Sequence, residues 1–141
     1  MEFFPPLLED FHMATQTNTK NLSLALTLFG LIFTFGIYPL TKLWPSGWSW
    51  DPPQAEYLQM ILGIYATLGI FLLLAARNPL QHLSLIWFTV WSSLVHAGIM
   101  AYHSFMDPVE RGHLIGDVAA LVLVAVVLAA LTPRQSGTTS T

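Results

Sequence analysis

The sequence contains no cysteine and few charged residues. Without cysteine, it cannot form disulfides, thiolate metal sites, iron–sulfur clusters or a cysteine nucleophile. Only 9% of its 141 residues are charged, whereas a soluble domain usually carries about 25%. Its hydrophobic fraction is 54% and its mean hydropathy is +0.58, so we expect lipid around the chain. The five Lys and Arg residues are scattered and the net charge is -3, which argues against nucleic-acid binding.

The N-terminal stretch lacks the features of a secretory signal. Its first residues include Glu2, Glu9 and Asp10, whereas a signal peptide begins with positive charge and runs into one apolar core. We therefore expect residues 1–20 to form a poorly ordered tail. An interfacial position in the lipid headgroups is the alternative, because several Phe and Leu residues occur there.

Four apolar stretches are each close to the ~20 residues that a helix needs to cross a hydrocarbon core. Pro39 is expected to end the first, while Asp51-Pro52 and Asp107-Pro108 are typical helix starts with an N-cap followed by proline. The short turn at Asp107-Pro108 predicts that the last two helices are antiparallel neighbours. We expect an all-α integral membrane four-helix bundle with antiparallel up-down-up-down topology. Its helices span residues 21–38, 52–76, 80–106 and 108–131, followed by a polar tail over residues 133–141.

Three tryptophans occur in the proline-containing stretch Leu40–Pro53. Indole rings prefer the headgroup level of a bilayer, so Trp44, Trp48 and Trp50 predict an interfacial loop. A binding rim made by the same rings is the alternative.

Small residues within the first two stretches indicate places where helices approach closely. Gly30 and Gly36 lie in the first stretch, and Gly63, Ala66 and Gly69 lie in the second. These positions predict contacts between helices of this chain or with another membrane protein.

Lys and Arg in the loops set the expected orientation. One side carries three of them (Lys20, Arg77 and Arg134) and the other carries two (Lys42 and Arg111). The positive-inside rule therefore predicts that both termini are cytoplasmic and that the Asp107 turn faces outward.

Titratable side chains interrupt the apolar pattern of the last two helices. On the third helix, spacings of 4, 3, 4 and 3 define one stripe, which consists of Thr89, Ser93, His96, Met100 and His103. On the fourth helix, His113 and Asp117 are four residues apart and share a face. The rise of a helix places His96 and Asp117 at matching depths, roughly 15–16 Å below the turn. His103 and His113 lie closer to the turn, and Glu56 lies on the same side of the membrane.

Charged groups in lipid are costly unless they are paired. We therefore expect these side chains to face inward, with His103 next to His113 and His96 next to Asp117. A purely structural role, in which these polar side chains pair and fix the register of the helices, explains their presence without any further function. The alternatives are a metal held by His103 and His113, a haem, or a proton path or quinone pocket. No tight metal-ligand motif is present, so the ligand stays open.

Four segments of the sequence cover residues 36–40 (GIYPL), 60–79, 84–100 and 110–116 (ERGHLIG). They resemble a family of small bacterial membrane proteins with a domain of unknown function, which is distantly similar to DoxX-type four-helix proteins. The resemblance implies a four-helix protein of the bacterial inner membrane and transfers no catalytic residue. The DoxX similarity implies association with membrane redox or quinone-linked machinery.

Taken as a whole, the pattern favours a small accessory subunit over an enzyme. Its expected partners are the lipid bilayer and another membrane protein or a second copy of itself. The alternative is a redox or proton-transfer protein that binds a cofactor or metal at His96, His103, His113 and Asp117.

Overall fold

The computed structural model describes residues 6–49 and 55–133, and these residues contain helices and no strand. The α-helices are α1 (Pro6–Leu31), α2 (Ile37–Leu43), α3 (Pro45–Trp48), α4 (Ala55–Ala75), α5 (Leu83–Met106) and α6 (Asp117–Leu131). A π-helical turn (Ile32–Gly36) joins α1 to α2, and 3₁₀ segments (Pro79–Gln81 and Pro108–Leu114) precede α5 and α6. The all-α prediction is confirmed.

Within the described residues, four helical stretches are long and apolar enough to cross a membrane. They cover Asn18–Leu43, Glu56–Ala75, Leu83–Met106 and Pro108–Leu131. Only 17% of the Glu56–Ala75 stretch is buried inside the protein, so most of α4 needs an apolar solvent. The four predicted stretches are thus confirmed as candidate spans.

The first helix differs from its expected boundaries at both ends. No proline interrupts the chain between Pro6 and Leu31, and α1 includes most of the segment that we expected as a tail. The prediction that Pro39 ends the helix is wrong, because the helix continues to Leu43. The π-helical turn shifts the hydrogen-bond register, with the N–H of Ile37 bonded to Ile32 O. Pro39 then lies in the first turn of α2, where its missing N–H is tolerated.

The fourth stretch is not the continuous α-helix that we expected from Pro108 onward. A 3₁₀ segment runs from Pro108 to Leu114, and α6 begins only at Asp117. Gly116 has ψ of -111° and breaks the helix between them. The N-cap at Asp107 is confirmed, because its side chain accepts a 2.9 Å hydrogen bond from the N–H of Val109. The predicted N-cap at Asp51 and the ring of Trp50 lie outside the described residues.

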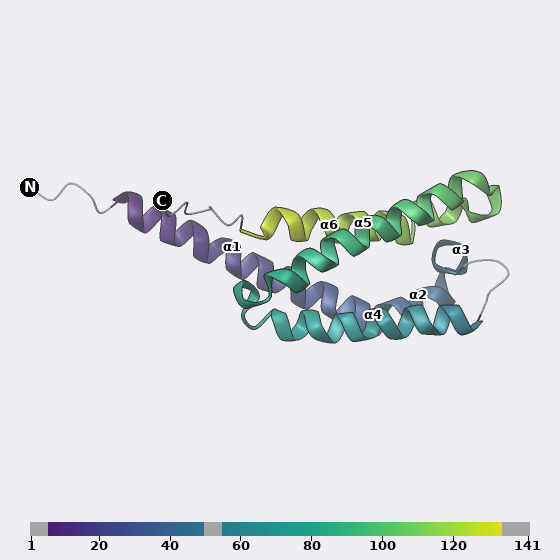
Figure 1. Ribbon diagram of the computed structural model, residues 1–141, viewed down its shortest axis with the longest axis horizontal. Coiled ribbons are helices and arrows are strands. Elements are labelled where there is room, and N and C mark those ends of the chain that lie inside the picture. The colour runs from purple at the N-terminus through teal and green to yellow at the C-terminus, as the bar shows by residue number, and fades with distance from the viewer. Residues whose placement is uncertain (1–5, 50–54, 134–141) are drawn as a thin grey trace, which may run out of the picture.

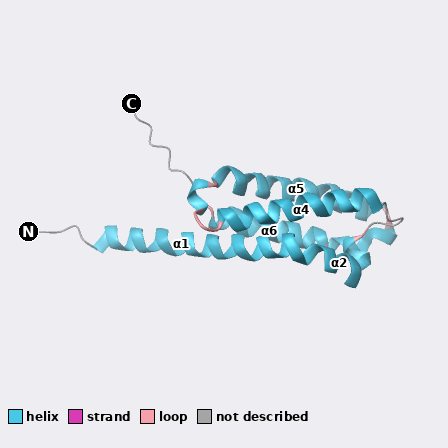
Figure 2. Cartoon of the chain, turned by 90° about the horizontal axis from the view of Figure 1, so that it is seen from below, coloured by secondary structure: helices cyan, strands magenta, loops and turns pink. Residues whose placement is uncertain are grey.

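The four long helices form two pairs, α1 with α4 and α5 with α6. The two pairs also touch each other, because α1 contacts α6. Figure 1 shows the two pairs on opposite sides of the molecule, with α3 beside the turn that leads into α6. In Figure 2, the N-terminal part of α1 projects beyond the other helices. The fully buried leucine and isoleucine side chains of the core come from all four long helices: Leu22, Leu26, Leu72, Ile86 and Leu128.

Two glycines allow the close packing of α1 and α4. A Cβ atom on Gly69 would lie 2.7 Å from Gly30 O and 2.7 Å from the N of Thr34. A Cβ atom on Gly30 would lie 2.9 Å from Gly69 O. The predicted helix contact is therefore confirmed at Gly30 and Gly69. Gly63 has open space around it, and the nearest atoms to Gly36 belong to Ile32 on the same helix.

A second glycine contact fixes the start of α6 against α3. A Cβ atom on Gly112 would collide with Ser46 O, and one on Gly116 would collide with Gly47 O. The backbones of α3 and the 3₁₀ segment therefore touch directly. Because Trp48 and Asp117 each follow one of the touching glycines, this contact brings their backbones to the same end of the bundle.

Candidate functional site

A cavity of about 170 Å³ lies between the two helix pairs. Its walls are mainly apolar and come from α1 with the π-helical turn, from α2 to α4, and from α5 and α6. Five side chains bring nitrogen or oxygen atoms with them: Thr41, Trp48, Tyr65, His96 and Asp117. These few polar groups in an apolar wall are typical of a small-molecule site.

Tyr65 and His96 connect the two helix pairs at the cavity. The hydroxyl of Tyr65 on α4 and Nδ1 of His96 on α5 form a 2.8 Å hydrogen bond. The ring of Phe33 packs edge-on against Tyr65 with a centroid distance of 5.1 Å. The phenol is thus held by a hydrogen bond on one side and a ring contact on another, which fixes its position in the wall.

On the opposite wall, Asp117 belongs to a buried series of three titratable side chains. Oδ2 of Asp117 forms a 2.8 Å hydrogen bond with Nδ1 of His113. Nε2 of His113 lies 3.2 Å from Oε2 of Glu110. His113 is 0% exposed, Glu110 is 5% exposed and Asp117 is 9% exposed. The imidazole therefore lies between two carboxylates and holds the Asp117 side chain in one orientation.

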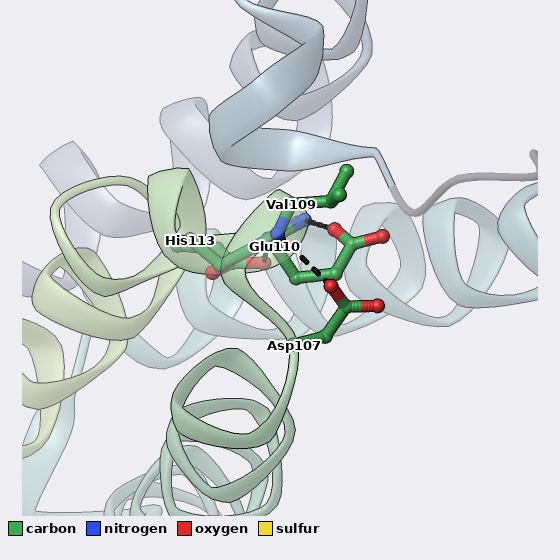
Figure 3. Close-up of polar contacts among 5 residues, drawn as sticks. Asp107, Val109, Glu110 and His113 are labelled. Carbon is green, nitrogen blue, oxygen red and sulfur yellow. Dashed lines mark hydrogen bonds and ion pairs between the residues drawn. The ribbon is translucent and has the colours of Figure 1, made fainter.

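The 3₁₀ segment explains how this series forms. Asp107 caps its start and Glu110 follows within the first turn, so Glu110 and His113 are three residues apart on a tight helix. In a 3₁₀-helix, residues at that spacing lie directly above each other. Figure 3 shows Val109, Glu110 and His113 in this segment and Asp107 at its N-cap.

Two residues of the cavity wall carry a buried polar atom without a hydrogen-bond partner in strict geometry among the described residues. They are Trp48, with its Nε1, and Asp117, with its Oδ1. Each of these atoms has less than 1 Å² of exposed surface, so neither is open to a molecule in the cavity. The N–H groups of Asp117 and Val118 are directed toward the Asp117 carboxyl group.

The cavity opens at the apolar surface of the bundle. Three side chains of its wall are also exposed: Ile32 by 38%, Ile61 by 43% and Leu123 by 57%. They lie on the π-helical turn, α4 and α6, within stretches that are apolar enough to cross a membrane. An opening with this composition faces acyl chains when the helices are embedded in lipid.

The structure separates the residues that we expected to form one cluster. Thr89, Ser93 and Met100 are buried as the stripe predicted, but His103 is exposed. Glu56 is exposed near the start of α4 and does not line the cavity. His96 and Asp117 do line the same cavity, in agreement with their matching depth.

The predicted pair of His96 with Asp117 is wrong, because His96 bonds to Tyr65 and Asp117 bonds to His113. His113 and Asp117 are four residues apart, and this spacing lets them bond to each other directly. His113 also directs both ring nitrogens at carboxylates, whereas we expected His103 beside it. Within residues 6–49 and 55–133, no three His, Asp or Glu side chains are grouped as metal ligands.

Three residues of the site were not identified as such from the sequence. Trp48 was expected to lie at the interface, with the binding rim as its alternative, and Tyr65 and Glu110 were not part of the predicted polar cluster. A hydroxyl in the middle of an apolar stretch requires a partner, and this signal could have linked Tyr65 to His96. The position of Trp48 had no sequence signal, because it depends on the glycine contact between α3 and the 3₁₀ segment.

The fold and the site together define a small multi-pass membrane protein with a mainly apolar cavity. The chain belongs to the family of unknown function DUF6632, which it matches over residues 16–141. No curated protein and no solved structure matches the chain. The family assignment agrees with the part of the resemblance that named a family of unknown function, and it brings no activity with it.

Proposed function

We propose that this membrane protein binds a small apolar molecule that enters from the bilayer. The observation that carries the proposal is the cavity of about 170 Å³ with exposed Ile32, Ile61 and Leu123 in its wall. In another protein, an engineered apolar cavity of about 150 Å³ is large enough to bind benzene. The cavity is therefore of the right size for a compound with a single ring.

For the location, role and topology of the protein, we propose what the sequence favours. The protein acts as an accessory component of a bacterial cytoplasmic membrane, with an up-down-up-down arrangement of its helices. Both termini are cytoplasmic in this proposal, and the support is the three-to-two count of Lys and Arg in the loops. Fusing a reporter that is active on only one side of the membrane to each terminus tests this orientation.

Saturable binding of a ring compound tests the binding function. We would follow fluorobenzene by ¹⁹F NMR with the full chain in lipid nanodiscs and use empty nanodiscs to subtract partitioning. Ala120 lines the cavity, and Ala119 beside it is exposed. Ala120→Leu should abolish saturable binding because it fills the cavity, while Ala119→Leu adds the same atoms elsewhere and should bind normally. The proposal fails if the wild-type chain shows no saturable binding or if both variants bind equally well.

Association with another membrane protein, or with a second copy, is a second proposal. Its support is Gly98 on α5, which is exposed and has no atom within 4 Å of an added Cβ, between the exposed side chains of Val95 and Tyr102. Small residues at the surface let another helix approach closely in lipid. Gly98→Leu should release a partner in native mass spectrometry from mild detergent. A wild-type chain that stays a monomer without a partner contradicts this proposal.

A redox or proton-transfer role with a bound cofactor or metal is the remaining alternative from the sequence. The position of His96 and Asp117 at one cavity supports it. A visible absorption spectrum and elemental analysis of the purified protein test it. A colourless preparation without metal would contradict this role.

A further inference from the structure

We infer that a groove at the end of the bundle opposite the Asp107 turn binds the headgroup of an anionic phospholipid. This groove is separate from the cavity, and the inference does not depend on the proposed binding of a ring compound. Lys20 on α1 and Arg77 in the turn after α4 carry it, together with the position of the groove at the ends of two candidate spans.

The groove has a volume of about 520 Å³ and lies between α1 and the turn that follows α4. Figure 1 shows this turn beside α1, and the 3₁₀ segment Pro79–Gln81 that follows the turn contacts α1. Oγ of Ser23 donates a 2.6 Å hydrogen bond to Ala76 O across the groove walls. This bond joins residues 53 positions apart and holds the two walls against each other.

The described side chains of the groove bring positive charge and no negative charge. Lys20 and Arg77 both line it, and both are exposed. Neither forms an ion pair with another described residue. The other lining residues are uncharged: Gln16, Thr19, Ser23, Ala76, Pro79 and Leu80. Two cations in one groove attract an anion, and the guanidinium group of arginine matches the geometry of a phosphate group.

The groove also lies at the depth of lipid headgroups. The candidate span Asn18–Leu43 begins two residues before Lys20, and the span Glu56–Ala75 ends two residues before Arg77. At a rise of about 1.5 Å per residue, both cations lie within about 3 Å of a span end. The phosphate groups of a bilayer lie just outside its hydrocarbon core, so a lipid phosphate can reach both side chains.

The surface next to the groove suits the acyl chains of the same lipid. Leu24 and Leu28 follow Lys20 at one and two helical turns, so the three residues share a face of α1. The two leucines are 70% and 53% exposed. A headgroup at Lys20 places its acyl chains over this apolar face. A free phosphate ion would gain nothing from these leucines, and we therefore assign the groove to a lipid.

The experiment compares two lipids that differ in headgroup charge. Phosphatidylglycerol and phosphatidylcholine with identical acyl chains are titrated into the full chain in mild detergent, and native mass spectrometry gives the affinity of the first bound lipid. We expect phosphatidylglycerol to bind about five- to thirtyfold more tightly, because each Lys or Arg near an anionic headgroup contributes about fivefold. This preference should fall as the ionic strength rises.

Variants with matched charge assign the preference to the groove. The double variant Lys20→Gln and Arg77→Gln should lower the preference to about onefold. Lys42→Gln with Arg111→Gln removes the same charge from two exposed cations that do not line the groove, at the opposite ends of their spans. This control should keep the preference. Arg77→Lys retains the charge and should keep most of it.

Three outcomes would overturn the inference. Equal affinities for the two lipids would show that the groove does not recognise an anionic headgroup. An equal loss of preference in both double variants would assign the effect to net charge instead of the groove. Displacement of phosphatidylglycerol by an equal concentration of inorganic phosphate would identify a free anion as the occupant. The groove and the cavity share no lining residue, so fluorobenzene binding should be the same in all these variants and tests the proposed function separately.

Discussion

The contact between α1 and α4 can be tested with the same substitution at two glycines of one helix. In Gly69→Ala, the new Cβ atom lies 2.7 Å from Gly30 O and 2.7 Å from the N of Thr34, where ordinary contact begins at 3.4 Å. Both atoms belong to the backbone, so the helices must move apart at this point to accommodate the new methyl group. Overpacking of this kind costs about 1–3 kcal/mol.

Gly63→Ala is the matched control on α4. A Cβ atom at Gly63 meets nothing within 4 Å, so this variant should gain up to about 1 kcal/mol from the higher helix propensity of alanine. The two variants should therefore differ in unfolding free energy by about 1–3 kcal/mol, with Gly69→Ala the less stable. Reversible denaturation of the detergent-solubilised protein in mixed micelles with SDS measures this difference.

The same experiment has a second readout at the cavity. Tyr65 lies one helical turn before Gly69, so a shift of α4 at Gly69 should lengthen the bond between Tyr65 and His96. Gly69→Ala should then weaken fluorobenzene binding, while Gly63→Ala should not. The packing argument is refuted if Gly69→Ala is at least as stable as Gly63→Ala.

Three further predictions concern the site. Tyr65→Phe removes the hydrogen bond to His96 and should cost about 1 kcal/mol in the same denaturation assay, with unchanged helix content by circular dichroism. His113→Leu leaves the buried Asp117 side chain without its partner and should destabilise the protein by about 3–5 kcal/mol, which a large drop in melting temperature would reveal and an unchanged one would contradict. Gly116→Ala places a Cβ atom against Gly47 O and should cost about 1–3 kcal/mol; the Asp107→Ala variant, which loses only a cap, should cost about 1 kcal/mol.

Features that depend on neighbours in the sequence could be predicted well. The apolar stretches of about 20 residues, bounded by proline and Asp-Pro pairs, gave the four candidate spans because their length and composition are local properties. The N-cap at Asp107 and the buried side of α5 at Thr89, Ser93 and Met100 also followed from spacing along one helix. The close contact at Gly30 and Gly69 was indicated by residue size alone.

Features that depend on how helices are rotated and broken could not be predicted. His96 and Asp117 line the same cavity, but depth along a helix axis does not determine which way a side chain points. The π-helical turn carried the first helix past Pro39, and a break at Gly116 precedes the start of α6. Both changes alter the hydrogen-bond register of a helix without altering its hydropathy.

The sequence by itself determined that this protein is a set of apolar helices with a few polar side chains among them. The reason is that hydropathy and helix-start signals are local properties, which depend on each residue and its near neighbours in the chain. Only the tertiary structure decided which polar groups meet: Tyr65 with His96, and Asp117 with His113. It also decided that Trp48 and Asp117 share a cavity. The physical reason is that backbones in contact at glycines set the positions of these side chains, and such contacts join residues far apart in the chain.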